Sequence, residues 1–150
     1  MPQSFDSVLL HLVFSTKGRQ PLITDSVAPK LHAYLAKVCQ EMGSQAIIVN
    51  GMADHVHILC SLSRTVAISD LVERVKKRSS KWIKTLAAEH GSFQWQPGYG
   101  VFSIGKSNLE KLKSYIRDQP IHHRKHSYKE EFLALLRKYG VEPDEAHMWD

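Results

Sequence analysis

The run QAIIVNGMADHVHILCSL, residues 45–62, contains two apolar segments joined by a short link of turn-forming residues. Segments 45–50 and 55–62 have the length and β-branched content of strands, so we predict a β-hairpin. Successive side chains of a strand point to opposite faces, which gives His55 and His57 one face and the intervening apolar residues the other. The run therefore predicts a sheet with two imidazoles on one face.

Two imidazoles on a rigid strand have the geometry of metal ligands. They would leave a divalent cation with open positions for a carboxamide or carboxylate, water and a substrate, as a catalytic site requires. Asp54 could orient one imidazole, or it could simply belong to the turn. In the alternative interpretation, one histidine forms a hydrogen bond at a half-buried sheet surface and the other is solvated. The pair alone does not decide between these roles.

Strands and helices alternate on both sides of the hairpin. Residues 7–15 (SVLLHLVFS) are apolar and β-branched enough for a central strand, and apolar residues at helical spacing predict a helix over 27–42. A second long helix is predicted over 69–89, and an aromatic segment interrupted by Pro-Gly predicts a broken strand over 93–104. The order βαββαβ predicts an α+β, ferredoxin-like fold, with a four-stranded antiparallel sheet backed on one face by two helices.

A third helix is predicted over 107–119. It begins with SNLE at 107–110, the pattern of a capping box, and Pro120 prevents it from continuing normally. Tyr115 and Gln119 are four residues apart, so one helix face offers a phenol and a carboxamide. In the alternative interpretation, the tyrosine extends the apolar stripe and the glutamine is a solvated residue of the last turn.

Length and composition indicate one ordinary domain. With 150 residues, 43% of them hydrophobic, we expect a single domain over 1–150, with a core over 5–104 and a C-terminal tail over 120–150. Cys39 and Cys60 are too few for a disulfide framework and lie in apolar segments, which favours buried, reduced thiols. We see neither a signal-peptide pattern nor a membrane-spanning run and expect a cytoplasmic protein without membrane association.

Positive charge is concentrated in two segments. The formal net charge is +5, and basic residues dominate 64–84 and 106–129, while 130–150 is acidic. Such segments can bind a polyanion, although they can also be solvated helix faces. The candidate DNA-binding residues are Arg74, Lys77, Arg78 and Lys81 in the second helix, and His122, His123, Arg124 and Lys125 after the third. For the histidine cluster that His126 completes, phosphate contact is favoured over a second metal site.

Taken together, these segments resemble the HUH-type single-tyrosine transposases of simple bacterial insertion sequences and their domesticated relatives, the REP-associated tyrosine transposases. The resemblance covers nearly the whole chain, and the order and spacing of its motifs are specific. The matching motifs are HLVFSTK at 11–17, DHVHIL at 54–59, WQPGYGVFS at 95–103, KSYIRDQ at 113–119, and HHRK at 122–125 followed by EEF at 130–132.

The resemblance implies roles for four residues. His55, His57 and Gln119 would be the metal ligands, and Tyr115, on the helix 107–119, would be the nucleophile. The chemistry agrees, because a phenol with a pKa near 10 is a poor nucleophile unless a cation and basic neighbours favour the phenolate. A divalent ion on the scissile phosphate would also neutralise its charge and align it for attack.

The resemblance further implies the substrate and the assembly. It implies single-stranded DNA with an adjacent hairpin, a 5′-phosphotyrosine intermediate, and a homodimer in which the tyrosine helix can serve the partner's metal site. No nucleotide cofactor is needed, and the sequence has no triphosphate-binding motif. Because phosphoryl chemistry in a cell favours abundant Mg²⁺, we expect Mg²⁺ with Mn²⁺ as a competent substitute.

Two other classes of protein remain open. A noncatalytic single-stranded nucleic-acid-binding module could use the same sheet and basic helices, but it would not need Tyr115 and Gln119 at this interval. A hydrolytic metal enzyme is the second alternative. Barrel hydrolases need a much longer chain, and a histidine-triad hydrolase would have a third histidine in place of Leu59.

Overall fold

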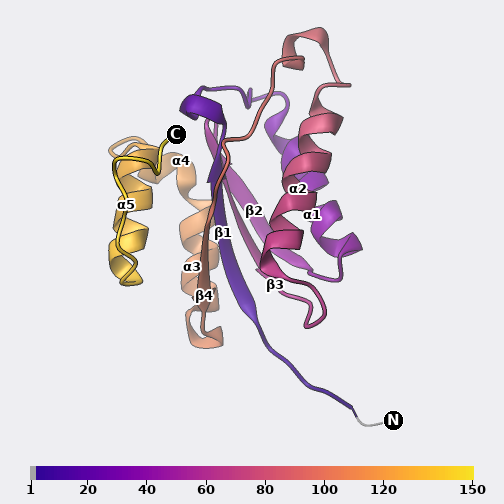
Figure 1. Cartoon of the computed structure of the whole chain (residues 1–150), viewed down its shortest axis with the longest axis vertical. Helices are drawn as coiled ribbons and strands as arrows, with labels where there is room; N and C mark the ends of the chain where they lie inside the picture. Colours follow the sequence, from indigo (N-terminus) through magenta and orange to yellow (C-terminus); the bar gives the residue numbers. More distant parts are fainter. Residues whose placement is uncertain (1–2) are drawn as a thin grey trace.

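A four-stranded antiparallel sheet forms the centre of the molecule, with the strand order β2-β3-β1-β4 (Figure 1). The computed structural model describes residues 3–150. Its strands are β1 (Leu9–Ser15), β2 (Ala46–Met52), β3 (His55–Ser61) and β4 (Gly100–Ile104). Its helices are α1 (Ala28–Glu41), α2 (Ile68–Ile83), α3 (Leu109–Arg117), α4 (Gln119–His122) and α5 (Tyr128–Lys138), with 3-10 turns at Lys17–Arg19, Ala88–His90 and Lys106–Asn108. This topology confirms the predicted ferredoxin-like α+β fold.

The predicted hairpin is formed by β2 and β3, and its register places the histidines. His57 lies opposite Val13 on β1 and opposite Asn50 on β2. The strands approach closely at Gly51, where a Cβ atom would lie only 2.8 Å from the Cα atom of Val56. Because β3 is paired on both sides, its side chains are held firmly on their two faces.

The apolar face of the sheet packs against α1 and α2. Val56 and Ile58 of β3 are buried there with Leu12 and Phe14 of β1 and with the apolar stripes of both helices. The Phe14 ring also meets the ring of Trp95 edge-on, with a centroid distance of 4.8 Å. Since burying one such side chain contributes roughly 1.5–3 kcal/mol, this cluster anchors the strand that carries the histidines.

The histidine-bearing face is covered by α3, α4 and α5 (Figure 1). Val13 and Phe102 of the sheet pack there with Tyr128 and Leu136 of α5 in a second, smaller cluster. The two helices predicted to back one face are α1 and α2, and α3, α4 and α5 add a layer on the other face; no element was predicted in the tail 120–150. The tail forms α5 because its apolar residues have a face of the sheet to cover.

The third helix is shorter than the predicted 107–119 at both ends: α3 spans Leu109–Arg117, and Gln119 begins α4. Ser107 lies within a 3-10 turn, and Asn108 occupies the N-cap of α3 without a side-chain hydrogen bond. A capping box begins α5 instead: the Ser127 hydroxyl accepts from the backbone N–H of Glu130, whose carboxylate accepts from the backbone N–H of Ser127. The strongest local helix-start signal therefore belongs to the helix that we did not predict.

The last strand is shorter than predicted. Only residues 100–104 of the predicted strand 93–104 join β1, and Trp95 makes an isolated bridge. Pro97 has no N–H to donate, and Gly98 turns the chain with φ at 94°. The second helix is likewise shorter than predicted, and no helix within residues 3–150 is long and apolar enough to cross a membrane.

Candidate metal centre and tyrosine site

Strand β3 presents His55 and His57 together beneath the covering helices. Both side chains are fully buried, and their ring centroids lie 5.1 Å apart. Their Nε2 atoms converge on one carboxylate oxygen, Oε1 of Glu131, at 3.3 Å from His55 and 3.0 Å from His57. The two imidazoles thus point to a single spot, as the alternation along the strand predicts.

The junction between α3 and α4 brings Tyr115 and Gln119 to the same spot. Gln119 is fully buried, and its Oε1 accepts a hydrogen bond from His55 Nε2 at 2.9 Å. The Tyr115 hydroxyl donates to Oε2 of Glu131, and Gln119 Nε2 donates to the same oxygen at 2.8 Å. All four residues that the sequence singled out therefore converge, from two separate parts of the chain.

Asn50 attaches the tyrosine helix to the hairpin. Its side-chain amide donates to the backbone carbonyls of Ile116 and Arg117, at 3.1 and 3.2 Å. These are the last residues of α3, and such carbonyls lack partners inside their own helix. Because Asn50 lies opposite His57 in the sheet, the bond ties the end of the tyrosine helix to the metal-ligand strand.

Sequence reasoning missed Glu131, although the site is built around it. The side chain is 7% exposed and lies in the first turn of α5, where Tyr128 packs its ring 4.6 Å from that of His55. Burial alone would raise the pKa of Glu131, but hydrogen bonds from His123, His55 and His57 hold it far below its usual range. The available signal was the capping box at Ser127, which starts a helix whose first turn contains this glutamate.

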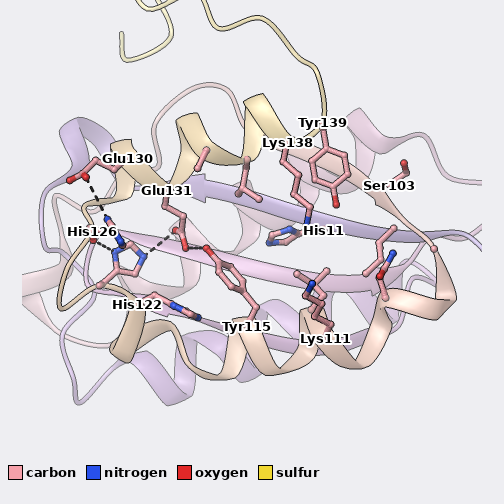
Figure 2. Close-up of a pocket in the computed structure, with 17 residues that line it drawn as sticks. His11, Ser103, Lys111, Tyr115, His122, His126, Glu130, Glu131, Lys138 and Tyr139 are labelled. Atoms are coloured by element: carbon pink, nitrogen blue, oxygen red, sulfur yellow. Dashed lines mark hydrogen bonds and ion pairs between the residues drawn. The ribbon is translucent and has the colours of Figure 1, made fainter.

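Tyr115 is half-buried and protonated in this arrangement. Burial, followed by its hydrogen bond to the negative Glu131, raises the pKa of the phenol above its ordinary value. Its ring stacks on that of His122 with a centroid distance of 4.6 Å. Figure 2 shows the phenol pointing from α3 toward Glu131 on α5. The hydroxyl therefore needs a proton acceptor before it can attack, and a carboxylate oxygen already receives its hydrogen bond.

The outer nitrogens of both histidines are also held. Asp54 Oδ1 lies 2.7 Å from His55 Nδ1, so Asp54 is both a turn residue and a partner of the imidazole. Burial would lower the pKa of His55, but its bonds to Asp54 and Glu131 raise it to about 9. His57 Nδ1 lies 2.7 Å from Nε2 of His11, which is itself fully buried. Burial lowers the pKa of His57 despite the adjacent carboxylate.

The geometry fits a divalent metal ion. The candidate ligand atoms of His55, His57 and Glu131 all lie within 4.8 Å of one another, and Gln119 Oε1 adjoins them. Imidazole nitrogens with a carboxylate and a carboxamide suit first-row ions. Metal-binding histidines usually have their other ring nitrogen held by a hydrogen-bond partner, as Asp54 and His11 provide here.

The candidate DNA-binding residues fall in two regions. Those of the second helix lie on α2, across the sheet from Tyr115, and Arg78 is paired there with Glu41. The second group, His122, His123, Arg124 and Lys125, lies at and after the end of α4. His123 is part of the buried cluster, because its Nε2 lies 3.1 Å from Oε1 of both Gln119 and Glu131.

Comparison with known proteins places this site in a family. The family described as "Transposase IS200 like" matches residues 4–119, which include the hairpin histidines and the tyrosine helix. The ISDra2 transposase TnpA of Deinococcus radiodurans is 26% identical over 114 residues, covering 73% of this chain and 81% of that protein. The transposase for insertion sequence element IS200 of Salmonella typhimurium is 26% identical over 117 residues, covering 73% and 74%.

Solved structures share the fold. A transposase structure from Deinococcus radiodurans superimposes with a TM-score of 0.62 at 24% identity, covering 79% of this chain and 98% of that one. The structure of a REP-associated tyrosine transposase bound to a REP hairpin gives a TM-score of 0.61 at 15% identity, covering 82% and 73%. The chain therefore belongs to the IS200-like transposase family, which confirms the predicted HUH-type single-tyrosine class and, with it, the prediction of an enzyme.

Proposed function

We propose that this protein cleaves and rejoins single-stranded DNA through Tyr115, with a divalent metal ion held by His55, His57, Gln119 and Glu131. One observation carries the proposal: a phenol from α3 and two imidazoles from β3 meet at the same buried carboxylate. A noncatalytic nucleic-acid-binding module has no need for this convergence. The metal would neutralise the scissile phosphate and align it for in-line attack.

The residues then have the following roles. The Tyr115 hydroxyl proton, held at Oε2 of Glu131, passes to that carboxylate as Oη attacks phosphorus. The Oη–P bond forms, the P–O3′ bond breaks, and the leaving 3′ oxygen takes the proton from Glu131 to become a hydroxyl, which returns the carboxylate to its charged form. The product is a 5′-phosphotyrosine, which keeps the energy of the phosphodiester bond. A second 3′-hydroxyl can therefore reverse the step and join two strands without a nucleotide cofactor.

Further parts of the proposal rest on the resemblance and on general chemistry. Mg²⁺ is the proposed ion, with Mn²⁺ as a substitute, because carboxylate and carboxamide oxygens suit both. The proposed substrate carries a DNA hairpin, which is supported by the REP hairpin in one solved relative. A homodimer and a cytoplasmic location complete the proposal.

Covalent capture of DNA tests the function. The protein is incubated with Mg²⁺ or Mn²⁺ and a pool of hairpin-bearing single strands labelled at the 3′ end, since a 5′-phosphotyrosine retains that end. We expect a denaturation-resistant labelled adduct that is lost in Tyr115→Phe, because the variant has no hydroxyl to attack.

Tyr99→Phe is the matched control, because Tyr99 is an exposed tyrosine outside the site and its loss should leave the adduct unchanged. DNA binding without an adduct under both ions would favour the noncatalytic module. Sustained nucleotide hydrolysis without a covalent intermediate would favour the hydrolytic metal enzyme.

A further inference from the structure

A cavity of about 740 Å³ lies between α3 and α5 and extends along the sheet from Tyr115 (Figure 2). We call it the α3–α5 cavity. Its walls include the apolar side chains of Leu112 on α3 and of Ala134 and Leu135 on α5. Its volume lies within the roughly 300–1,000 Å³ of typical small-ligand sites, so it is large enough for a nucleotide.

The cavity combines an aromatic surface with positive charge. Tyr139 lines it, and the Tyr139 ring is held by stacking on Phe102 with a centroid distance of 4.8 Å. Lys111 and Lys138 lie on its two helices, and within residues 3–150 neither forms an ion pair with a carboxylate. An aromatic and apolar interior with cations at the edge is the combination that binds a base together with its phosphate.

A buried polar atom in the wall also lacks a partner. His11 is fully buried and lines the cavity, and its Nε2 is occupied by His57. Its Nδ1 has no hydrogen-bond partner within the described chain. An unpaired buried polar atom costs free energy, so a ligand group that bonds to Nδ1 would recover that cost.

We infer that the α3–α5 cavity receives a base of the single strand, next to the phosphate that Tyr115 attacks. The inference rests on the proposed function for the position of that phosphate. Tyr115 forms part of the cavity wall, so a strand that reaches its hydroxyl passes the cavity opening. The base packs between Leu112 and Tyr139 while its polar edge reaches His11, and Lys111 and Lys138 contact the neighbouring phosphates.

The test compares two strands in the Tyr115→Phe protein, which cannot form an adduct. Short single strands of randomised sequence, and abasic strands of equal length, are labelled with fluorescein and titrated by anisotropy. We expect the base-containing strands to bind about tenfold more tightly, the effect of one stacked base. Lys111→Gln and Lys138→Gln should weaken both strands and each lower the salt dependence by about one phosphate contact.

Filling the cavity should remove the preference for bases. In Ala134→Trp the indole occupies the cavity, so the ratio of the two affinities should fall toward one. Ala87→Trp introduces the same side chain at an exposed position outside the cavity and should keep the ratio. Leu112→Ala removes wall contacts without added bulk and should lower the ratio by a smaller factor, which covers the case in which the tryptophan variant does not fold.

The outcomes separate the two proposals. An undiminished preference in folded Ala134→Trp or in Leu112→Ala overturns the base site, whether or not Tyr115 forms an adduct. If both substitutions lower the preference for bases, and the protein with Tyr115 intact forms no adduct, the result supports the base site and counts against tyrosine chemistry.

Discussion

At the scale of single residues, the site depends on which ring nitrogen of each histidine carries a proton. His57 can bind a metal through Nε2 only if its proton is on Nδ1, and His11 is positioned to accept that proton in a hydrogen bond. His11 performs this role best as a neutral imidazole. Burial, followed by repulsion from His57, lowers the pKa of His11 to about 3. The fold thus keeps this histidine uncharged at neutral pH.

His11 should therefore lower the free energy of unfolding of the metal-free protein as the pH falls below neutrality. The folded pKa of about 3 lies below the unfolded value of 6.5, so the unfolded chain binds the proton first as the pH falls. The contribution of His11 to the free energy of unfolding is fully present above pH 6.5. It is lost between pH 6.5 and pH 3, at about 1 kcal/mol per pH unit.

Urea unfolding between pH 4 and pH 7 in the presence of a chelator measures this slope for the wild type and for His11→Gln. The wild type should lose stability more steeply than the variant, which has no group to titrate at this position. Equal slopes would show that His11 is not held neutral by the fold.

At the scale of elements, the sequence predicts what local patterns determine. The alternation along β3 predicts the shared face of His55 and His57, and helical spacing predicts the shared face of Tyr115 and Gln119. The first prediction holds because it depends on one strand. The second assumed one continuous helix, whereas Tyr115 lies on α3 and Gln119 begins α4; the two side chains still reach the same carboxylate across that junction. Glu131 was missed because its role depends on how α5 docks across the sheet, which no periodicity in the chain encodes.

The capping box of α5 should matter more than its exposed position implies, because this helix supplies Glu131. Ser127→Ala removes the cap and should lower the free energy of unfolding by about 1 kcal/mol. Amide exchange should increase in α5 more than in α1. Ser107→Ala is the matched control, since no side-chain bond of Ser107 caps α3. Similar effects of the two substitutions would contradict the assignment of the cap.

At the scale of the whole molecule, one chain assembles the complete cluster. The metal-ligand strand lies between the α1/α2 layer and the layer formed by α3, α4 and α5, and the latter brings the tyrosine to the histidines of its own chain (Figure 1). The proposed dimer could exchange tyrosine helices between partners, but the described arrangement does not require exchange.

Mixing two inactive variants distinguishes attack within one chain from attack across a dimer. Tyr115→Phe lacks the nucleophile and His57→Ala lacks a ligand, so attack within one chain predicts no adduct in the mixture. Attack across a dimer would place the adduct on the His57→Ala chain, because only that chain keeps its tyrosine. Size tags on the two chains identify which one carries DNA in a denaturing gel.

The bond from Asn50 to the end of α3 has a consequence for how the enzyme tolerates motion. A twist of the β2–β3 ribbon would carry the tyrosine with it, so thermal flexing shifts the attacking oxygen and the imidazoles in concert rather than past one another. A single carboxamide that bonds to the backbone of the tyrosine helix would thereby preserve the alignment of the reactive groups.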